Sequence, residues 1–186
     1  MLFKNEKKSK KKKIYILLTK FPDTGSRLLS AFTGSYFTHA SIGLEEDMNT
    51  FYSFVYKGFI VEKINRYVKP GKEPMPCELY EIEACEKKYK RVKKLINNFV
   101  ESKKLFSYAK IGLAMSLFSI PYHQNKAYFC SQFVSEILGK CNILNIKKNS
   151  LLCLPKHLRN VPNTTLGYKG NLKGFLEYFG ISPLPV

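Results

Sequence analysis

A cysteine and a histidine far apart in the sequence offer the chemistry of a thiol nucleophile and its base. Cys130 stands in Tyr-Phe-Cys-Ser-Gln-Phe-Val, where a helical pattern of apolar residues begins. The free N–H groups and the positive dipole end of a helix N-terminus stabilise a thiolate. The backbone N–H groups of Cys130 and Ser131 would also bind the oxyanion of a tetrahedral intermediate. We therefore predict that Cys130 is a nucleophile; the alternative is a small buried packing residue.

His39 is the predicted base for this thiol. The chain has only three histidines, and His39 opens an apolar strand in Phe-Thr-His-Ala-Ser-Ile-Gly-Leu. Strand alternation puts Ala40 and Ile42 on the face toward the core and His39 on the other face, toward a cleft or helices. A base that takes the proton of a thiol also needs a third group that fixes its ring.

The group that orients His39 is expected on the neighbouring strand. If residues 45–49 form a hairpin turn, residues 53–55 lie opposite His39. Ser53 is the polar residue in that window, and its hydroxyl would select the imidazole tautomer. A hydroxyl orients a ring less strongly than a carboxylate does, so Glu45 and Glu62 are alternatives.

Three further side chains are weaker candidates. His123 lies in a polar loop close to Cys130 in the sequence, so it is a secondary candidate for the site. Tyr108 is a candidate for lining the pocket or supporting an oxyanion, with simple packing as the alternative. His157 follows a proline at a helix start, and we expect it at the surface.

The elements that must position these residues change type half-way along the chain. Runs rich in Phe, Tyr, Ile and Val predict strands in the first half. Apolar residues at helical spacing predict helices in the second half. This order predicts an α+β domain with a mostly antiparallel sheet packed against helices. The predicted strands are 14–18, 38–44, 50–56, 59–64 and 77–82, and the predicted helices are 26–32, 89–100, 108–118, 130–138 with Gly139 as its stop, a short turn from Pro155, and 172–179.

Length and charge suggest one domain with a basic surface. The 186 residues suit a single core, placed at 14–181, with a loose end at 182–186. The net charge is +17, and seven of the ten residues from Lys4 to Lys13 are lysine, so 1–13 is predicted to be a flexible tail. This charge favours anionic surfaces such as a membrane, with a solvated Lys-rich surface as the alternative. No motif for specific nucleic-acid binding is present.

Cysteine usage and hydropathy bear on compartment and cofactors. Five cysteines without paired spacing argue against a disulfide framework, and the absence of Cys-x-x-Cys argues against a zinc site. No metal or other cofactor is implied. Reduced thiols point to the cytoplasm, and the apolar runs are too short for a signal core or a membrane span.

The order of these motifs resembles a known family. Thr-His-Ala-Ser-Ile-Gly followed much later by Phe-Cys-Ser-Gln-Phe-Val is similar to the circularly permuted papain-like hydrolases of the NlpC-type superfamily, which include the YiiX/YaeF-like amidases. Lecithin–retinol acyltransferase-like proteins share the order, but their Asn-Cys-Glu-His motif is absent. The resemblance covers roughly residues 14–139. It implies a thioester on Cys130, formed from an amide or ester of a small-molecule, peptide or lipid-like acyl substrate. It also implies a Glu, or a second His, on the strand where Ser53 stands.

Two readings without catalysis compete with the hydrolase. In one, the chain is a binding module whose basic tail and helix 89–100 hold an anionic membrane or polyanion, and Cys130 only packs. In the other, it is a pseudoenzyme that keeps the fold and pocket. Thiol reactivity of Cys130 separates both from the enzyme.

Overall fold

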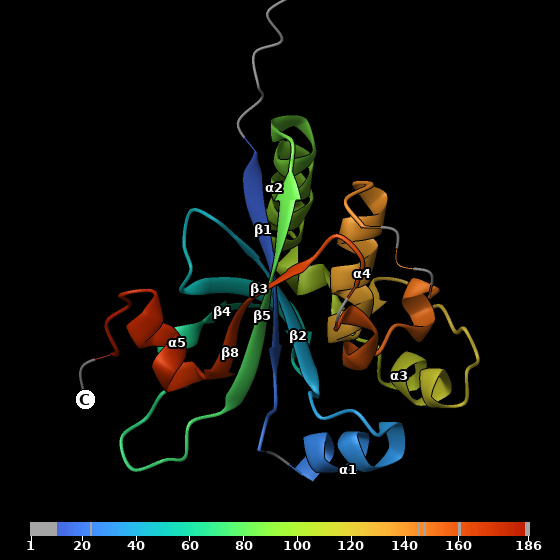
Figure 1. Ribbon diagram of the computed structural model, residues 1–186. Coiled ribbons are helices and arrows are strands. Elements are labelled where there is room, and N and C mark those ends of the chain that lie inside the picture. The colour runs from blue at the N-terminus through green and yellow to red at the C-terminus, as the bar shows by residue number, and fades with distance from the viewer. Residues whose placement is uncertain (1–10, 23, 145, 147, 160, 185–186) are drawn as a thin grey trace, which may run out of the picture.

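A computed structural model describes residues 11–22, 24–144, 146, 148–159 and 161–184. In this part of the chain a six-stranded sheet forms the centre of the molecule, in the order β4-β3-β2-β1-β5-β8 (Figure 1). Every neighbouring pair of strands is antiparallel. The strands are β1 (Lys12–Thr19), β2 (His39–Leu44), β3 (Thr50–Val55), β4 (Gly58–Lys63), β5 (Pro76–Ala84) and β8 (Thr165–Asn171), and a parallel pair, β6 (Ser107–Tyr108) with β7 (Ala127–Tyr128), lies outside this sheet.

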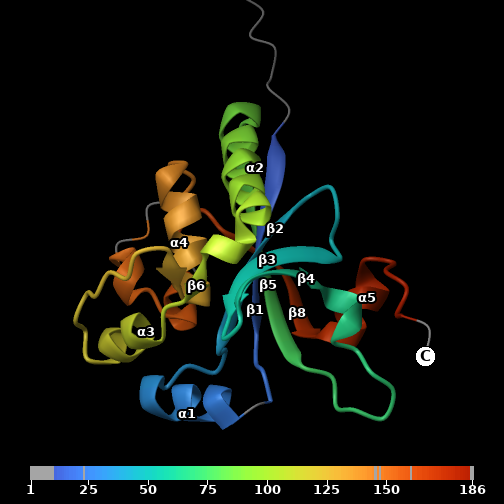
Figure 2. The ribbon, with the colours of Figure 1, turned by 180° about the vertical axis from the view of Figure 1, so that it is seen from behind.

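Helices lie on both sides of the sheet and at one end of it. Figure 1 and the view from behind in Figure 2 place α4 and α5 on opposite sides. In both views α1 and α3 lie together at the end of the molecule away from α2. The α-helices are α1 (Thr24–Thr33), α2 (Glu86–Glu101), α3 (Lys110–Leu117), α4 (Cys130–Lys140) and α5 (Leu172–Tyr178), and the short 3-10 helices span Ile64–Arg66, Lys103–Leu105, Ser150–Leu152 and Pro155–Leu158.

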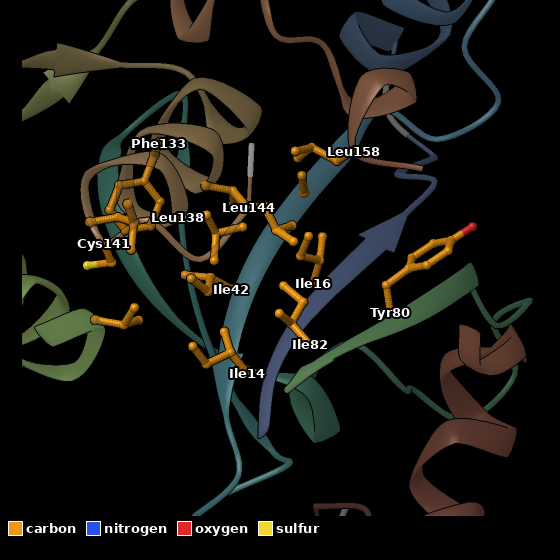
Figure 3. Close-up of a cluster of buried hydrophobic side chains, with 14 of the residues drawn as sticks. Ile14, Ile16, Ile42, Tyr80, Ile82, Phe133, Leu138, Cys141, Leu144 and Leu158 are labelled. Atoms are coloured by element: carbon orange, nitrogen blue, oxygen red, sulfur yellow. The ribbon is translucent and has the colours of Figure 1, made fainter. Parts of the chain in front are cut away.

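The larger hydrophobic core fills the space between the sheet and helices α2 and α4. Strand alternation turns Ile14, Ile16 and Ile42 to this side, and the apolar stripe of α4 meets them with Phe133 and Leu138 (Figure 3). The expected core-facing position of Ala40 and Ile42 is therefore confirmed. Burial of this face fixes α4 against β2, which is the contact that matters for the site.

A smaller core covers the other face of the sheet. Tyr15, Leu17 and Phe51 point to this side and pack against Phe175 and Leu176 of α5. Both faces of β1 are thus buried, which explains why its sequence reads as a continuous apolar run instead of an alternating one. The predicted α+β class with an antiparallel sheet is confirmed.

Most predicted element ends differ from the structure by a few residues. Two of these differences, and one strand that the sequence does not predict, have a local explanation. Residues 12 and 13, assigned to the basic tail, belong to β1, because the Lys13 ammonium lies 2.6 Å from a carboxylate oxygen of Glu81 on the neighbouring strand. Gly139 does not stop α4, which runs on to Lys140. β8 was not predicted from the sequence, because this edge strand is largely exposed and lacks an apolar pattern. Residues 1–10, which make up most of the predicted tail, and residues 185–186 lie outside the described residues.

Candidate active site

Cys130 is the first residue of α4, and its surroundings hold the start of the helix in place. The side-chain oxygen of Gln132 accepts a hydrogen bond from the N–H of Phe129 at 3.3 Å, which is one half of a capping box. The hydroxyl of Ser131 donates to the carbonyl of Cys153 at 2.6 Å. Cys130 is buried, and the helix N-terminus that carries it has little freedom to move.

His39 is the first residue of β2, and contacts on three sides fix its ring. Nε2 lies 2.7 Å from Oε1 of Glu62. The ring of Phe21 packs on the imidazole with a centroid distance of 4.5 Å. A further hydrogen bond joins the imidazole to Cys130. Because Glu62 takes Nε2, Nδ1 is the ring nitrogen that remains for the sulfur.

Glu62 is a buried carboxylate on β4 that gathers the polar groups behind His39. Besides His39, the Ser41 hydroxyl donates to it at 2.5 Å and the Tyr67 hydroxyl at 3.4 Å. Burial disfavours the charged form of a carboxylate and would raise its pKa. The charge of His39 and these hydrogen bonds outweigh burial, so the pKa of Glu62 is lowered. Glu62 therefore stays ionised, and its carboxylate lies against the imidazole of His39.

The sheet brings these residues to one face although they lie on different strands. Gly43 pairs with Phe51, and Phe51 pairs with Glu62, so Glu62 shares the face of His39 and Ser41. A Cβ at Gly43 would lie 2.5 Å from the Phe51 ring, so glycine at this position leaves room for that ring to pack over β2. The pairing of β2 with β3 and of β3 with β4 places the Glu62 carboxylate within reach of the imidazole.

The ionisation states of Cys130 and His39 are linked. Burial would lower the pKa of His39, but the charge of Glu62 and the hydrogen bonds to Cys130 and Glu62 raise it to about 10. Burial would raise the pKa of Cys130, but the hydrogen bond and charge of His39, with backbone N–H groups of Ala40 and Ser131, lower it. Both shifts favour a thiolate–imidazolium pair.

The other buried cysteines behave in the opposite way. All five cysteines are free thiols. Burial raises the pKa of Cys141, and it raises the pKa of Cys77 and Cys153 to about 12. Because only the thiolate is a strong nucleophile, these three are expected to be inert. Burial by itself would therefore raise the pKa of Cys130 as well, and it is mainly the contact with His39 that lowers it.

Cys130 and His39 line a pocket of about 490 Å³. Its wall is mostly apolar and comes from α1, β3, α3 and the loops beside them. A second pocket of about 520 Å³ lies at the C-terminal end of α4, and neither Cys130 nor His39 lines it. The residues that line the first pocket, besides Cys130 and His39, are Phe21, Gly25, Ser26, Leu29, Thr38, Phe54, Val55, Tyr56, Tyr67, Tyr108 and Leu113.

The structure corrects the predicted orienting group. Ser53 is buried, but its hydroxyl donates to the backbone carbonyl of Ala40 at 2.6 Å and does not fix the ring of His39. Its role is structural: the ladder between β2 and β3 is paired only at Ile42 and Gly43, and the Ser53 hydroxyl bridges the strands where they separate. Glu62, one of the two alternatives, occupies the orienting position instead.

The remaining predicted residues divide between the site and its surroundings. Glu45, the other alternative, binds Lys12 and the N–H of Lys13 and does not reach His39. His123 is exposed and does not line the pocket, whereas Tyr108 does line it. His157 is half-buried rather than at the surface, because its Nδ1 accepts from the N–H of Leu154 and caps the start of the 3-10 helix Pro155–Leu158.

The two predicted oxyanion donors, the backbone N–H groups of Cys130 and Ser131, differ in whether they already have a partner. The N–H of Ser131 donates to the sulfur of Cys130 itself. The N–H of Cys130 lies at the first position of α4, where helical N–H groups have no partner within the helix. Cys130 is therefore the better placed of the two for an oxyanion.

Three residues of the site had not been predicted from the sequence. Strand alternation puts Ser41 on the same face as His39, but its hydrogen bond to Glu62 depends on the register of the strands. Phe21 and Tyr67 lie in loops, and no local pattern in the sequence predicts which loop residues line this pocket. The glutamine three residues after Phe129 is the one usable signal that was missed, because it marks a helix start.

In residues 11–184, apart from the few positions left undescribed, no cluster of three or more His, Cys, Asp or Glu side chains is arranged to hold a metal ion. None of the helices described there has the length and apolar character needed to cross a bilayer.

Comparison with known proteins does not assign the chain to a family. No protein-family model matches it, and no curated protein gives a match.

Proposed function

We propose that this protein is a thiol hydrolase that cleaves an amide or ester bond through a thioester on Cys130. The observation that carries the proposal is the chain of contacts from Cys130 to His39 and from His39 to Glu62, set in the wall of an apolar pocket. A nucleophile, a base and an orienting carboxylate in that order are the parts of a catalytic triad.

The first half of the reaction forms the acyl-enzyme. The Cys130 thiolate attacks the carbonyl carbon of the substrate, a C–S bond forms, and the N–H of Cys130 stabilises the oxyanion. When the intermediate collapses, the C–N or C–O bond breaks. The imidazolium of His39 gives its Nδ1 proton to the leaving amine or alkoxide. Glu62 holds the ring in place and stays ionised.

The second half restores the thiolate. Neutral His39 takes a proton from water, and the resulting hydroxide adds to the thioester carbonyl. The C–S bond then breaks, and the carboxylic acid product leaves. Another acceptor in place of water would make the same site an acyltransferase. No metal or organic cofactor takes part in these steps.

Two further points support the proposal. The motif order resembles that of the permuted papain-like hydrolases, and such a fold has a histidine on a sheet and a cysteine at a helix N-terminus. The two residues lie on β2 and α4, elements that pack closely together. The pocket beside them is lined mainly by apolar and aromatic side chains, which suits an acyl group with an apolar body.

Trapping the acyl-enzyme tests this proposal. We expect p-nitrophenyl acetate to give a burst of nitrophenol and an acetyl group on the peptide that contains Cys130, detected by mass spectrometry and removed by hydroxylamine. A Cys130→Ala variant should lose about 10³-fold or more of the turnover. The matched control is Cys85→Ser, which removes the exposed thiol and should change neither signal. Acetylation of Cys85 alone, with wild-type turnover in Cys130→Ala, would leave Cys130 as a packing residue in a non-catalytic protein.

A further inference from the structure

Helices α1 and α3 each have two different faces. Toward the interior, Leu29 of α1 and Leu113 of α3 line the pocket that holds Cys130. Toward solvent, α1 carries Leu28 and Phe32 one helical turn apart, and the exposed face of α3 begins with Ile111. Both faces are thus apolar, although only the inner one is covered by the rest of the chain.

The degree of exposure at this end is unusual for apolar side chains. Phe32, Phe118 and Tyr56 are 76%, 75% and 71% exposed, more than any other large hydrophobic side chain in the described residues. Tyr56 lines the pocket, and the two phenylalanines belong to α1 and to the C-terminal end of α3. Figures 1 and 2 place these two helices together at one end of the molecule. Exposed apolar residues that gather in one place mark an interaction surface.

Charge indicates what this surface binds. The segments 24–44 and 102–135, which contain α1 and α3, carry Arg27 and four lysines but no Asp or Glu. A cation precedes an exposed apolar residue on each helix, as Arg27-Leu28 and as Lys110-Ile111. Several acidic side chains outside these two segments form ion pairs with lysines, as Glu45 does with Lys12, so part of their charge is already neutralised. Apolar side chains bordered by cations and free of acids match the surface of an anionic bilayer.

We infer that the exposed faces of α1 and α3 form a docking surface for an anionic lipid bilayer, beside the mouth of the pocket. The phenylalanines insert among the acyl chains, and Arg27 and Lys110 contact the phosphates of the headgroups. The docking itself does not depend on catalysis. That lipid acyl groups then reach Cys130 from the bilayer rests on the proposed function.

The absence of tryptophan from the sequence gives a direct test. A Phe32→Trp or Phe118→Trp variant carries a single tryptophan, which reports on its own position only. With vesicles of phosphatidylcholine and phosphatidylglycerol we expect its emission to shift to the blue and to be quenched by brominated acyl chains. The matched control is Tyr178→Trp on α5, a position 66% exposed on the other side of the sheet, which should show neither change. Equal responses at all three positions, or none at Phe32 and Phe118, would overturn the inference.

Vesicle sedimentation with the full chain separates insertion from simple charge attraction. We expect Phe32→Ser combined with Phe118→Ser to weaken binding to anionic vesicles about 10-fold or more, because two apolar anchors are lost. Tyr178→Ser should bind within about 2-fold of wild type, since surface changes away from the anchors have small effects. Every variant keeps residues 1–13, so their charge contributes equally. Wild-type binding by the double variant would show that charge alone holds the protein, which contradicts docking by α1 and α3.

These results are independent of the hydrolase proposal. Binding can be measured with Cys130→Ala as well as with wild type, and the two should bind alike. If vesicle binding fails while Cys130 is still acetylated, only the docking surface is wrong. If Cys130 is inert while the tryptophans still insert, the chain is a membrane-binding module and the hydrolase proposal falls.

Discussion

Replacing His39 with Ala is expected to reduce the turnover of p-nitrophenyl acetate by about 10²- to 10⁴-fold, the range associated with loss of a general acid–base group. The reason is twofold. In the proposed mechanism the imidazole moves the proton, and its positive charge lowers the pKa of Cys130. Without that charge, only the backbone N–H groups of Ala40 and Ser131 oppose burial, which is the largest influence on the thiol. The pKa of Cys130 should then rise to that of an ordinary thiol or above, so less than about 1% of it is thiolate at pH 6.

The same variant gives a second readout that does not depend on a substrate. Alkylation of Cys130 by iodoacetamide at pH 6 should slow by about 100-fold or more, in proportion to the lost thiolate. His39→Gln fills more of the space and guards against a simple loss of folding, which circular dichroism checks. His123→Ala, which removes an exposed histidine, is the matched control and should react like wild type. Unchanged alkylation in both His39 variants would refute the ion pair.

Exchange of Glu62 for Gln should have the second largest effect, about 10²- to 10⁴-fold on turnover. The glutamine side chain has nearly the same shape but no charge, so the largest influence that raises the pKa of His39 disappears. The amide can also donate to Nε2, which selects the tautomer with a proton on Nδ1. A ring in that state cannot accept the proton of the Cys130 thiol.

The pH dependence distinguishes this effect from a loss of structure. In wild type the raised pKa of His39 and the lowered pKa of Cys130 extend the reactive thiolate to acidic pH. With Glu62→Gln the pKa of His39 falls and that of Cys130 rises, so the onset of alkylation moves to higher pH. A merely destabilised protein would keep the onset and lose amplitude.

Ser53→Ala is the matched control for Glu62→Gln, because both side chains are buried and polar on neighbouring strands. Ser53 bonds the Ala40 carbonyl, so its loss should cost about 1 kcal/mol of stability with little change in the rate or its pH dependence. If Ser53→Ala shifts the onset and Glu62→Gln does not, Ser53 is the orienting residue after all.

The sequence predicted the elements well where burial alone determines them. The alternation of Ala40 and Ile42 correctly identified the core face of β2. The apolar helical pattern that begins at Cys130 correctly predicted α4, whose Phe133 and Leu138 face the same core. β8 escaped because an exposed edge strand has no such pattern to read. The position of Lys12 and Lys13 was misassigned because their partners, Glu45 and Glu81, lie on other segments that only the fold brings close.

The candidate site shows the same limit more sharply. Cys130 and His39 were found from local signals, a helix start and a strand start. The sequence left Glu62 as an alternative to Ser53. Which of the two side chains reaches His39 depends on where β2 and β3 separate, and the order of the strands does not reveal that. In the β2–β3 ladder only Ile42 and Gly43 of β2 are paired. Counting residues from the hairpin turn therefore does not predict which side chain of the neighbouring strands contacts the imidazole. Tertiary geometry decided in favour of the carboxylate.

The pH dependence of Cys130 alkylation is the measurement that tests the central claim most directly. It uses Cys85→Ser, in which the exposed thiol is gone and the other three are buried with raised pKa values. A thiolate held by the imidazolium of His39 predicts a rate that stays nearly level from about pH 8.5 far into the acidic range. A rate that falls about tenfold for each pH unit below about 8.5, as for an ordinary thiol, would contradict the account.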